Sequence, residues 1–143
     1  MIFCDTSAAV KLYAPELESK RVKLLFDKED QVCLSELTRV ELMGVFHRRL
    51  REGSWDQSQF LAALHQFSTD DLSGFWTWLP LDQAILQAAA KIYYTLPRTV
   101  FLRSSDCIQL VTALHHDFAE IYTYDRHQSL AASTFGLKAI SAS

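Results

Sequence analysis

Short apolar runs alternate with longer segments of helical spacing along the whole chain. The apolar runs predict five strands, at residues 1–4, 31–34, 75–79, 120–124 and 138–140. Between them, apolar residues recur every three or four positions, which is the spacing of one face of a helix. This spacing predicts helices at residues 6–13, 16–28, 35–51, 58–69, 82–94, 104 or 105 to about 116, and 126–135.

Capping and helix-breaking residues indicate where several of these helices begin and end. Ser35 and Asp82 are predicted N-caps, as is Ser104 or Ser105, because short polar side chains accept hydrogen bonds from the first turn. Pro97 is predicted to close the helix at residues 82–94.

Strands that alternate with helices from end to end are typical of an α/β sandwich with a mainly parallel sheet. The chain has 143 residues, a length that fits one compact domain over residues 1–143. No internal repeat, low-complexity tract or linker interrupts the pattern.

Composition narrows the function classes. A net charge of −3 argues against a protein that coats nucleic acid by bulk attraction, so nucleic-acid binding would need local basic patches or bound metal. Cys4 and Cys33 lie in apolar, strand-like runs and are predicted to be buried reduced thiols, which implies a reducing cytoplasm. The N-terminus does not read as a signal peptide, and no apolar run reaches membrane-spanning length.

Three aspartates follow strands or begin a helix. Asp5 and Asp125 directly follow predicted strands, and Asp106 lies in the first turn of its helix. Ligands of such sheets bind beyond the carboxyl ends of the strands, so these three carboxylates can converge there. Taken singly, each has an ordinary explanation as a helix cap or as a partner of the helix dipole.

Glu41 is the fourth candidate. On its helix it neighbours Leu37, Gly44 and Val45, and a carboxylate on an apolar face needs a partner because burying it alone is costly. A salt bridge to a nearby arginine, or a side chain that reaches water, is the alternative explanation.

Together the four acids favour metal-assisted chemistry. Carboxylates held close together repel one another, and a divalent cation relieves that repulsion. Oxygen ligands without a Cys or His cluster suit Mg²⁺ or Mn²⁺, ions that activate water and neutralise charge during attack on a phosphodiester. The chain has no GxGxxG, GxxxxGK[ST], HExxH or GxSxG motif, so the corresponding nucleotide, zinc and serine-hydrolase sites are not indicated.

Five segments of the chain, in order, resemble the PIN-domain ribonuclease family, in particular VapC-type toxins of toxin–antitoxin pairs. The segments are IFCDTSAAVKLY with Asp5 and Ser7, SELTRVELMGVFHRR with Glu41, WTWLPLDQAILQAA, LRSSDCIQLVTAL with Asp106, and TYDRHQSLAASTFGL with Asp125 two residues after Thr123. Each motif is weak alone, and the set covers nearly the whole chain. Cys107 and Gln109 stand where the family often has alanine and histidine, so a substrate contact can differ.

The resemblance implies a three-layer sandwich whose central, mainly parallel sheet has five strands. It implies that Asp5, Glu41, Asp106 and Asp125 form an acidic pocket for one or two Mg²⁺ or Mn²⁺ ions. It further implies endoribonuclease activity that leaves a 5′-phosphate and a 3′-hydroxyl, inhibition by a cognate antitoxin, and a homodimer.

Other polar side chains are candidates for supporting roles. Ser7 and Thr123 are expected to hydrogen-bond the carboxylates or the scissile phosphate, with capping as the alternative. Arg103 and Arg126 lie near the expected edge of the pocket, where a cation contacts RNA phosphates. The basic run Arg48, Arg49 and Arg51 is a further candidate, and the aromatic run Phe75, Trp76 and Trp78 is expected in the core or at a dimer surface.

Three alternatives remain open from the sequence. One is a catalytically silent PIN-like module that binds RNA or protein, and another is a DNA-directed nuclease with the same metal chemistry. A receiver-like signalling domain also has an acidic pocket at its strand ends, but the late strand IYTYD carries no lysine of the kind such a domain needs.

Overall fold

Every strand in the computed structural model, which describes residues 1–15 and 18–141, runs parallel to its neighbours. The strands are β1 (Ile2–Phe3), β2 (Val32–Ser35), β3 (Trp76–Leu79), β4 (Glu120–Tyr122) and β5 (Lys138–Ile140). The helices are α1 (Thr6–Ala9), the 3-10 turn η1 (Val10–Leu12), α2 (Ser19–Asp27), α3 (Leu37–Arg51), α4 (Gln57–Leu72), α5 (Gln83–Thr95), α6 (Ser104–His115) and α7 (Arg126–Thr134). The alternation that the sequence predicts is therefore confirmed.

The expectation of one continuous five-stranded sheet is corrected. The strands form a three-stranded sheet, β1–β2–β3, and a two-stranded sheet, β4–β5. A single parallel bridge between Cys4 and Tyr122 joins them, so that the spatial order is β3–β2–β1–β4–β5. The ladder stops there because Asp5, the next residue, already caps α1 and leaves β1 only two residues long.

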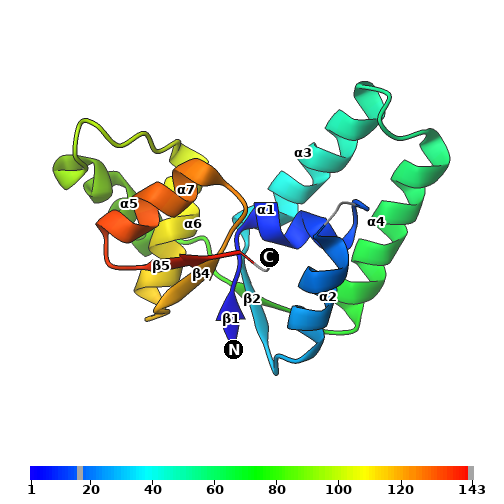
Figure 1. Ribbon diagram of the computed structural model, residues 1–143, viewed down its shortest axis with the longest axis horizontal. Coiled ribbons are helices and arrows are strands. Elements are labelled where there is room, and N and C mark those ends of the chain that lie inside the picture. Colours follow the sequence, from blue (N-terminus) through cyan, green and yellow to red (C-terminus); the bar gives the residue numbers. More distant parts are fainter. Residues whose placement is uncertain (16–17, 142–143) are drawn as a thin grey trace.

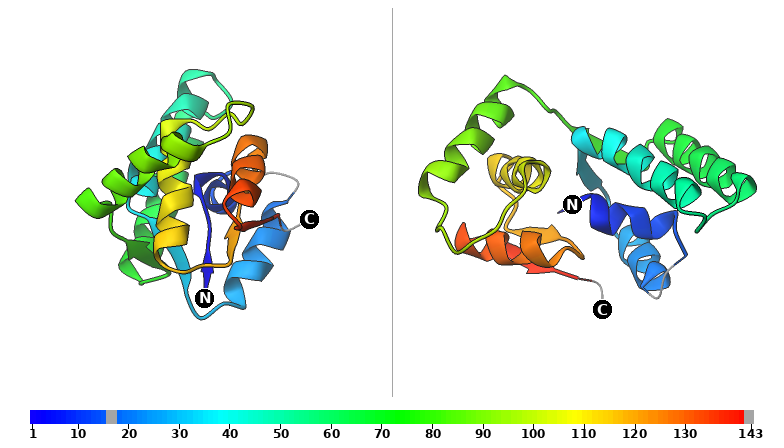
Figure 2. Two further views of the ribbon diagram at one scale, coloured as in Figure 1. Left: turned by 90° about the vertical axis from the view of Figure 1, so that its left-hand side faces the viewer. Right: turned by 90° about the horizontal axis from the view of Figure 1, so that it is seen from above.

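Alternate residues of the strands face two separate cores. Ile2, Val32 and Leu34 belong to a core with α1, η1, α2, α3 and α4, whereas Phe3 and Cys33 belong to a core with α5, α6 and α7. This period of two is the pleat of a strand buried on both faces. The two groups of helices lie on opposite sides of the strands, which makes the three layers (Figures 1 and 2).

Several helix starts differ from the sequence prediction. Asp82 caps α5 as predicted, by accepting a hydrogen bond from the backbone of Ile85. The cap predicted at Ser104 or Ser105 is wrong, because Arg103 is the N-cap residue of α6 and makes no capping bond with its side chain. Ser35 ends β2, although its hydroxyl still accepts from the backbone of Leu37 at the start of α3.

Other boundaries are also shifted. The helix predicted at residues 16–28 corresponds to α2, and residues 16–17 of that prediction lie outside the described residues. α4 begins one residue before the predicted 58 because Asp56 and Gln59 form a capping box.

Free thiols are buried in both cores. Cys4, Cys33 and Cys107 are free and buried, as predicted for Cys4 and Cys33. Among residues 1–15 and 18–141, no helix has the length and apolar character needed to cross a membrane.

Candidate active site

The strand order reverses direction between β1 and β4. From β1 the chain proceeds outward to β2 and β3, and it returns to the other side of β1 with β4 and β5. In open parallel sheets, this switch point is where connections leave in opposite directions and a crevice opens beyond the strand ends. Asp5 follows β1, and residues 123–125 follow β4, so both segments lie at the mouth of that crevice.

Asp5 is buried at the switch point, with 3% of its surface exposed. Its Oδ1 caps α1 by accepting from the backbone of Ala8 at 3.2 Å and also accepts from the hydroxyl of Ser7 at 2.6 Å. Its Oδ2 accepts from the hydroxyl of Thr123 at 2.5 Å. Burial raises the pKa of Asp5 to about 6. The three hydrogen bonds lower this pKa and the nearby Asp106 raises it, but the effect of burial is the largest.

Ser7 and Thr123 connect the two strand ends through Asp5. Each hydroxyl donates to the Asp5 carboxylate and accepts a backbone N–H from the segment after β4: Ser7 from Tyr124 at 2.8 Å, and Thr123 from Asp125 at 3.0 Å. The two sheets are therefore connected by the hydrogen bonds of Ser7 and Thr123 as well as by the bridge between Cys4 and Tyr122. The predicted contact of both hydroxyls with a carboxylate is present.

Asp125 and Asp106 both bind the guanidinium of Arg103. Asp125 caps α7 with Oδ1, which accepts from the backbone of Gln128 at 2.9 Å, and its Oδ2 accepts from Arg103 Nη2 at 2.9 Å. Asp106, in the first turn of α6, accepts from Arg103 Nε at 2.9 Å. Burial raises the pKa of Asp106, which Arg103 lowers and Asp125 raises. The guanidinium of Arg103 therefore bridges carboxylates from two elements.

Glu41 meets the pocket from α3. Its Oε1 accepts hydrogen bonds of 2.8 Å from the hydroxyl of Thr6 and from Nε2 of Gln109. Gln109 also lies 3.0 Å from the hydroxyl of buried Thr38. The partners of Glu41 are thus neutral donors on α1 and α6, rather than the neighbouring arginines that the alternative explanation invoked.

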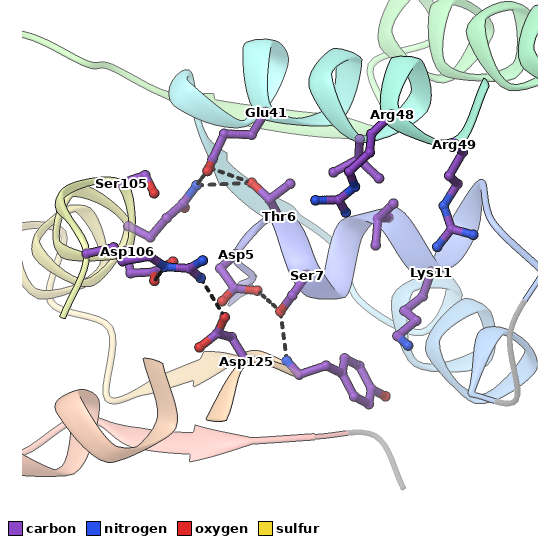
Figure 3. Close-up of a pocket in the computed structure, with 15 residues that line it drawn as sticks. Asp5, Thr6, Ser7, Lys11, Glu41, Arg48, Arg49, Ser105, Asp106 and Asp125 are labelled. Atoms are coloured by element: carbon purple, nitrogen blue, oxygen red, sulfur yellow. Dashed lines mark hydrogen bonds and ion pairs between the residues drawn. The ribbon is translucent and has the colours of Figure 1, made fainter. Parts of the chain in front are cut away.

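All four predicted acids line one pocket of about 410 Å³. Ser7, Arg48, Arg49 and Arg103 line it too. Figure 3 shows Ser7 on α1, Glu41 on α3, Asp106 on α6 and Asp125 after β4 around a common space. Thr123 is buried beside Asp5. Arg126, exposed at the start of α7, and Arg51 are not among the described residues that line the pocket.

The predicted aromatic run lies away from the pocket. Trp76 is buried in the core with α2, and Phe75 and Trp78 pack against that core. The expectation of a core position is therefore confirmed.

Several pocket residues were not predicted as site residues from the sequence. Lys11, Ser105 and Tyr124 line the pocket, as do Thr6 and Gln109. Lys11 lies on η1, one turn after Ser7, and its ammonium is 4.8 Å from the ring centre of Tyr124. The spacing of Ser7 and Lys11, four residues apart along one helical face, is the only sequence signal that points to this lysine.

The donor set suits a hard divalent cation. The pocket offers carboxylate and hydroxyl oxygens, and a positive group already bridges Asp106 and Asp125. In the conformation described for residues 1–15 and 18–141, no three acidic, histidine or cysteine side chains converge closely enough to hold one ion. The oxygen donors of the pocket nevertheless suit Mg²⁺ or Mn²⁺ by chemistry and charge, and in this conformation the guanidinium of Arg103 is the cation that contacts Asp106 and Asp125.

Solved structures share this fold. VapC20 of Mycobacterium tuberculosis, described as a sarcin–ricin loop cleaving toxin, aligns with a TM-score of 0.71 and 17% identity over 92% of this chain and 95% of that one. The FitAcB structure from Neisseria gonorrhoeae aligns with a TM-score of 0.74 and 21% identity over 99% of this chain and 98% of that one. VapBC2 of Rickettsia felis, bound to a fragment of its promoter DNA, aligns with a TM-score of 0.66 and 14% identity over 99% of this chain and 98% of that one.

Sequence comparison identifies the family directly. No curated protein matches the chain at a significant level. The family description "PIN domain" matches residues 2–133, a stretch that includes all four acids of the pocket. The chain therefore belongs to the PIN domain family.

Proposed function

We propose that this protein is a Mg²⁺- or Mn²⁺-dependent endoribonuclease that acts as the toxin of a toxin–antitoxin pair. The observation that carries the proposal is that Asp5, Glu41, Asp106 and Asp125, from four separate segments, all line one pocket at the switch point. Asp106 contributes to the raised pKa of Asp5 and Asp125 to that of Asp106, and a catalytic role offers a reason for an arrangement in which acids repel one another.

Each acid has a proposed role. Asp5, Glu41 and Asp106 hold the principal ion, directly or through water, and Asp125 completes the pocket as a ligand of a second ion or by orienting water. When bound, the ion activates water and neutralises charge on the phosphoryl group. Ser7 and Thr123 hold the Asp5 carboxylate in place through the bonds described above.

Basic side chains at the pocket supply contacts for a polyanion. Lys11, Arg48, Arg49 and Arg103 line the same pocket as the acids, although the whole chain carries a net charge of −3. Cations placed locally in this way bind the phosphates that flank a scissile bond. Arg126 remains a predicted RNA contact at the outer edge.

RNA is the preferred substrate class. A structural neighbour is described as a toxin that cleaves the sarcin–ricin loop, which supports RNA without identifying the target of this chain. A further neighbour, with a TM-score of 0.62, is described as a toxin–antitoxin complex from Klebsiella pneumoniae, and this supports a cognate antitoxin as partner. The homodimer, the cytoplasmic location and the single domain over residues 1–143 remain proposals, and family membership sets the receiver-like alternative aside.

The test is cleavage of labelled nucleic acids by purified protein in Mn²⁺. Transfer RNA, ribosomal RNA fragments and unstructured RNA are each compared with a DNA strand of matched sequence. We expect RNA cleavage that leaves a 5′-phosphate, and Asp106→Asn should slow it by roughly a hundredfold or more, since metal ligation supplies several kcal/mol to the transition state.

Asp117→Asn is the matched control. Asp117 is exposed and has a φ of 60°, a conformation that asparagine also tolerates, so this variant should cleave like the parent protein. Cleavage of DNA alone would favour the DNA-directed nuclease, and no cleavage of any strand would favour the silent binding module.

A further inference from the structure

The guanidinium of Arg103 occupies the position of a counter-ion in the acidic pocket. It donates from Nε to Asp106 and from Nη2 to Asp125, and each hydrogen bond is 2.9 Å long. Arg103 thus satisfies one oxygen of each carboxylate. These two acids belong to different elements, α6 and the cap of α7, and within residues 1–15 and 18–141 Arg103 is the ion-pair partner of both.

Exposure of the three side chains is unequal. The Arg103 side chain is 55% exposed, whereas those of Asp106 and Asp125 are 13% and 23% exposed. The carboxylates are thus held in the pocket wall, and the arginine reaches over them from the solvent side. An arginine more than half in water can leave by rotating its own side chain, without moving α6 or α7.

We propose that Arg103 is an internal competitor of the divalent ion, so that metal binding and the Arg103 bridge exclude each other. The inference rests on the proposed function and concerns how the site is regulated. The carboxylates that Arg103 engages, Asp106 and Asp125, are two of the four proposed ligands, and a guanidinium and a divalent cation cannot both approach them closely without strong repulsion. Arg103 therefore lowers the affinity of the pocket for metal, and it is released toward solvent when the ion binds.

The proposal predicts the sign of a mutational effect. If Arg103 competes, Arg103→Gln should bind Mn²⁺ more tightly, by about fivefold, since two partly exposed ion pairs together contribute only modestly. If Arg103 instead orients the carboxylates for the ion, the same substitution should weaken binding. Arg103→Lys keeps the charge but cannot bridge both acids with a planar fork, so its affinity should lie between those of the parent and Arg103→Gln.

The experiment measures free Mn²⁺ by its electron paramagnetic resonance signal while the metal-free full chain is titrated, without any RNA. Arg98→Gln is the matched control, because Arg98 is an exposed arginine of the same loop that does not line the pocket. A parallel thermal melt records the rise in Tm on addition of Mn²⁺, which should be larger for Arg103→Gln than for the parent and unchanged for Arg98→Gln. Circular dichroism checks that each variant is folded.

The outcomes separate this inference from the proposed function. Tighter binding by Arg103→Gln alone supports competition. Equal or weaker binding by Arg103→Gln, with binding lost in Asp106→Asn, overturns competition and leaves the metal-dependent nuclease in place. Absence of Mn²⁺ binding by the parent and by Arg103→Gln overturns both.

Discussion

Nε2 of Gln109 donates a 2.8 Å hydrogen bond to Oε1 of Glu41 and thereby links α6 to α3 inside the pocket. Gln109 is buried, with 1% of its surface exposed, and the hydroxyls of Thr6 and Thr38 lie within 3.2 Å and 3.0 Å of the same nitrogen. Gln109 thus fixes the position of the Glu41 carboxylate in the pocket.

Gln109→Met should therefore reduce both stability and cleavage. The substitution keeps the side-chain length but removes a donor from buried polar partners, which costs about 1–3 kcal/mol in the free energy of unfolding. RNA cleavage should fall because Glu41 would lose its bond to Gln109 and keep the one to Thr6. Urea denaturation and single-turnover cleavage measure the two effects, and a variant as stable and active as the parent would show that the contact is incidental.

The same substitution at a second buried glutamine should have the opposite sign. Gln128 on α7 is fully buried, and within the described part of the chain neither atom of its side-chain amide has a hydrogen-bond partner. Gln128→Met should raise the free energy of unfolding by about 1 kcal/mol, because it removes an unsatisfied polar group. Urea denaturation of both variants side by side makes the comparison, and destabilisation of the same size in each would mean that burial of any glutamine, rather than its hydrogen bonds, decides the result.

Asp5 should make the stability of the metal-free protein depend on pH. Its pKa is raised to about 6 in the folded state, against roughly 3.9 in an unfolded chain. Between these values the folded state binds more protons, so the contribution of Asp5 to the free energy of unfolding falls as the pH rises from about 4 to 6. Asp5→Asn keeps the helix cap and should lack this fall. At pH 7 its free energy of unfolding should exceed that of the parent by at most about 3 kcal/mol.

Denaturation in EDTA at several pH values tests this prediction. The difference in free energy of unfolding between Asp5→Asn and the parent should grow from pH 4 to pH 7. A difference that stays constant with pH would mean that the pKa of Asp5 is not raised in the folded protein.

Thr123→Val should move the pKa of Asp5 further upward. The hydroxyl of Thr123 donates to Oδ2 of Asp5 and lowers the pKa of that carboxyl, whereas valine has the same shape and no donor. The pH at which the stability of the metal-free variant falls should therefore shift above that of the parent, with a loss of about 1–3 kcal/mol from the unpaired polar groups. An unchanged pH profile would show that the bond to Thr123 contributes nothing to the charge state of Asp5.

The positions of the acids at the sheet edge could be predicted because they depend on local pattern. Asp5 and Asp125 directly follow apolar runs and therefore lie near the carboxyl ends of parallel strands, although β4 ends at Tyr122, two residues earlier than predicted, and Asp125 is the third residue after it. The partners of the acids could not be predicted in the same way. Gln109 and Thr6 are 103 positions apart in the chain, and nothing in either segment indicates that they meet at Glu41.

Two further differences have local causes. The helix predicted from residue 58 begins at residue 57, because Asp56 and Gln59, a D-x-x-Q pattern, form a capping box. The division into sheets of three and two strands depends on how many residues β1 contributes to pairing before Asp5 turns into α1, and an apolar run does not record that number.

Calorimetric titration of the metal-free protein with Mn²⁺ tests the central claim most directly, namely that carboxylates from distant segments bind one cation together. Asp5 and Asp106 lie on separate elements of the same pocket, so Asp5→Asn and Asp106→Asn should each weaken Mn²⁺ binding by about tenfold or more, while Asp117→Asn leaves it unchanged. Affinity that is equal in all three variants and the parent, or no binding by the parent, would contradict the account.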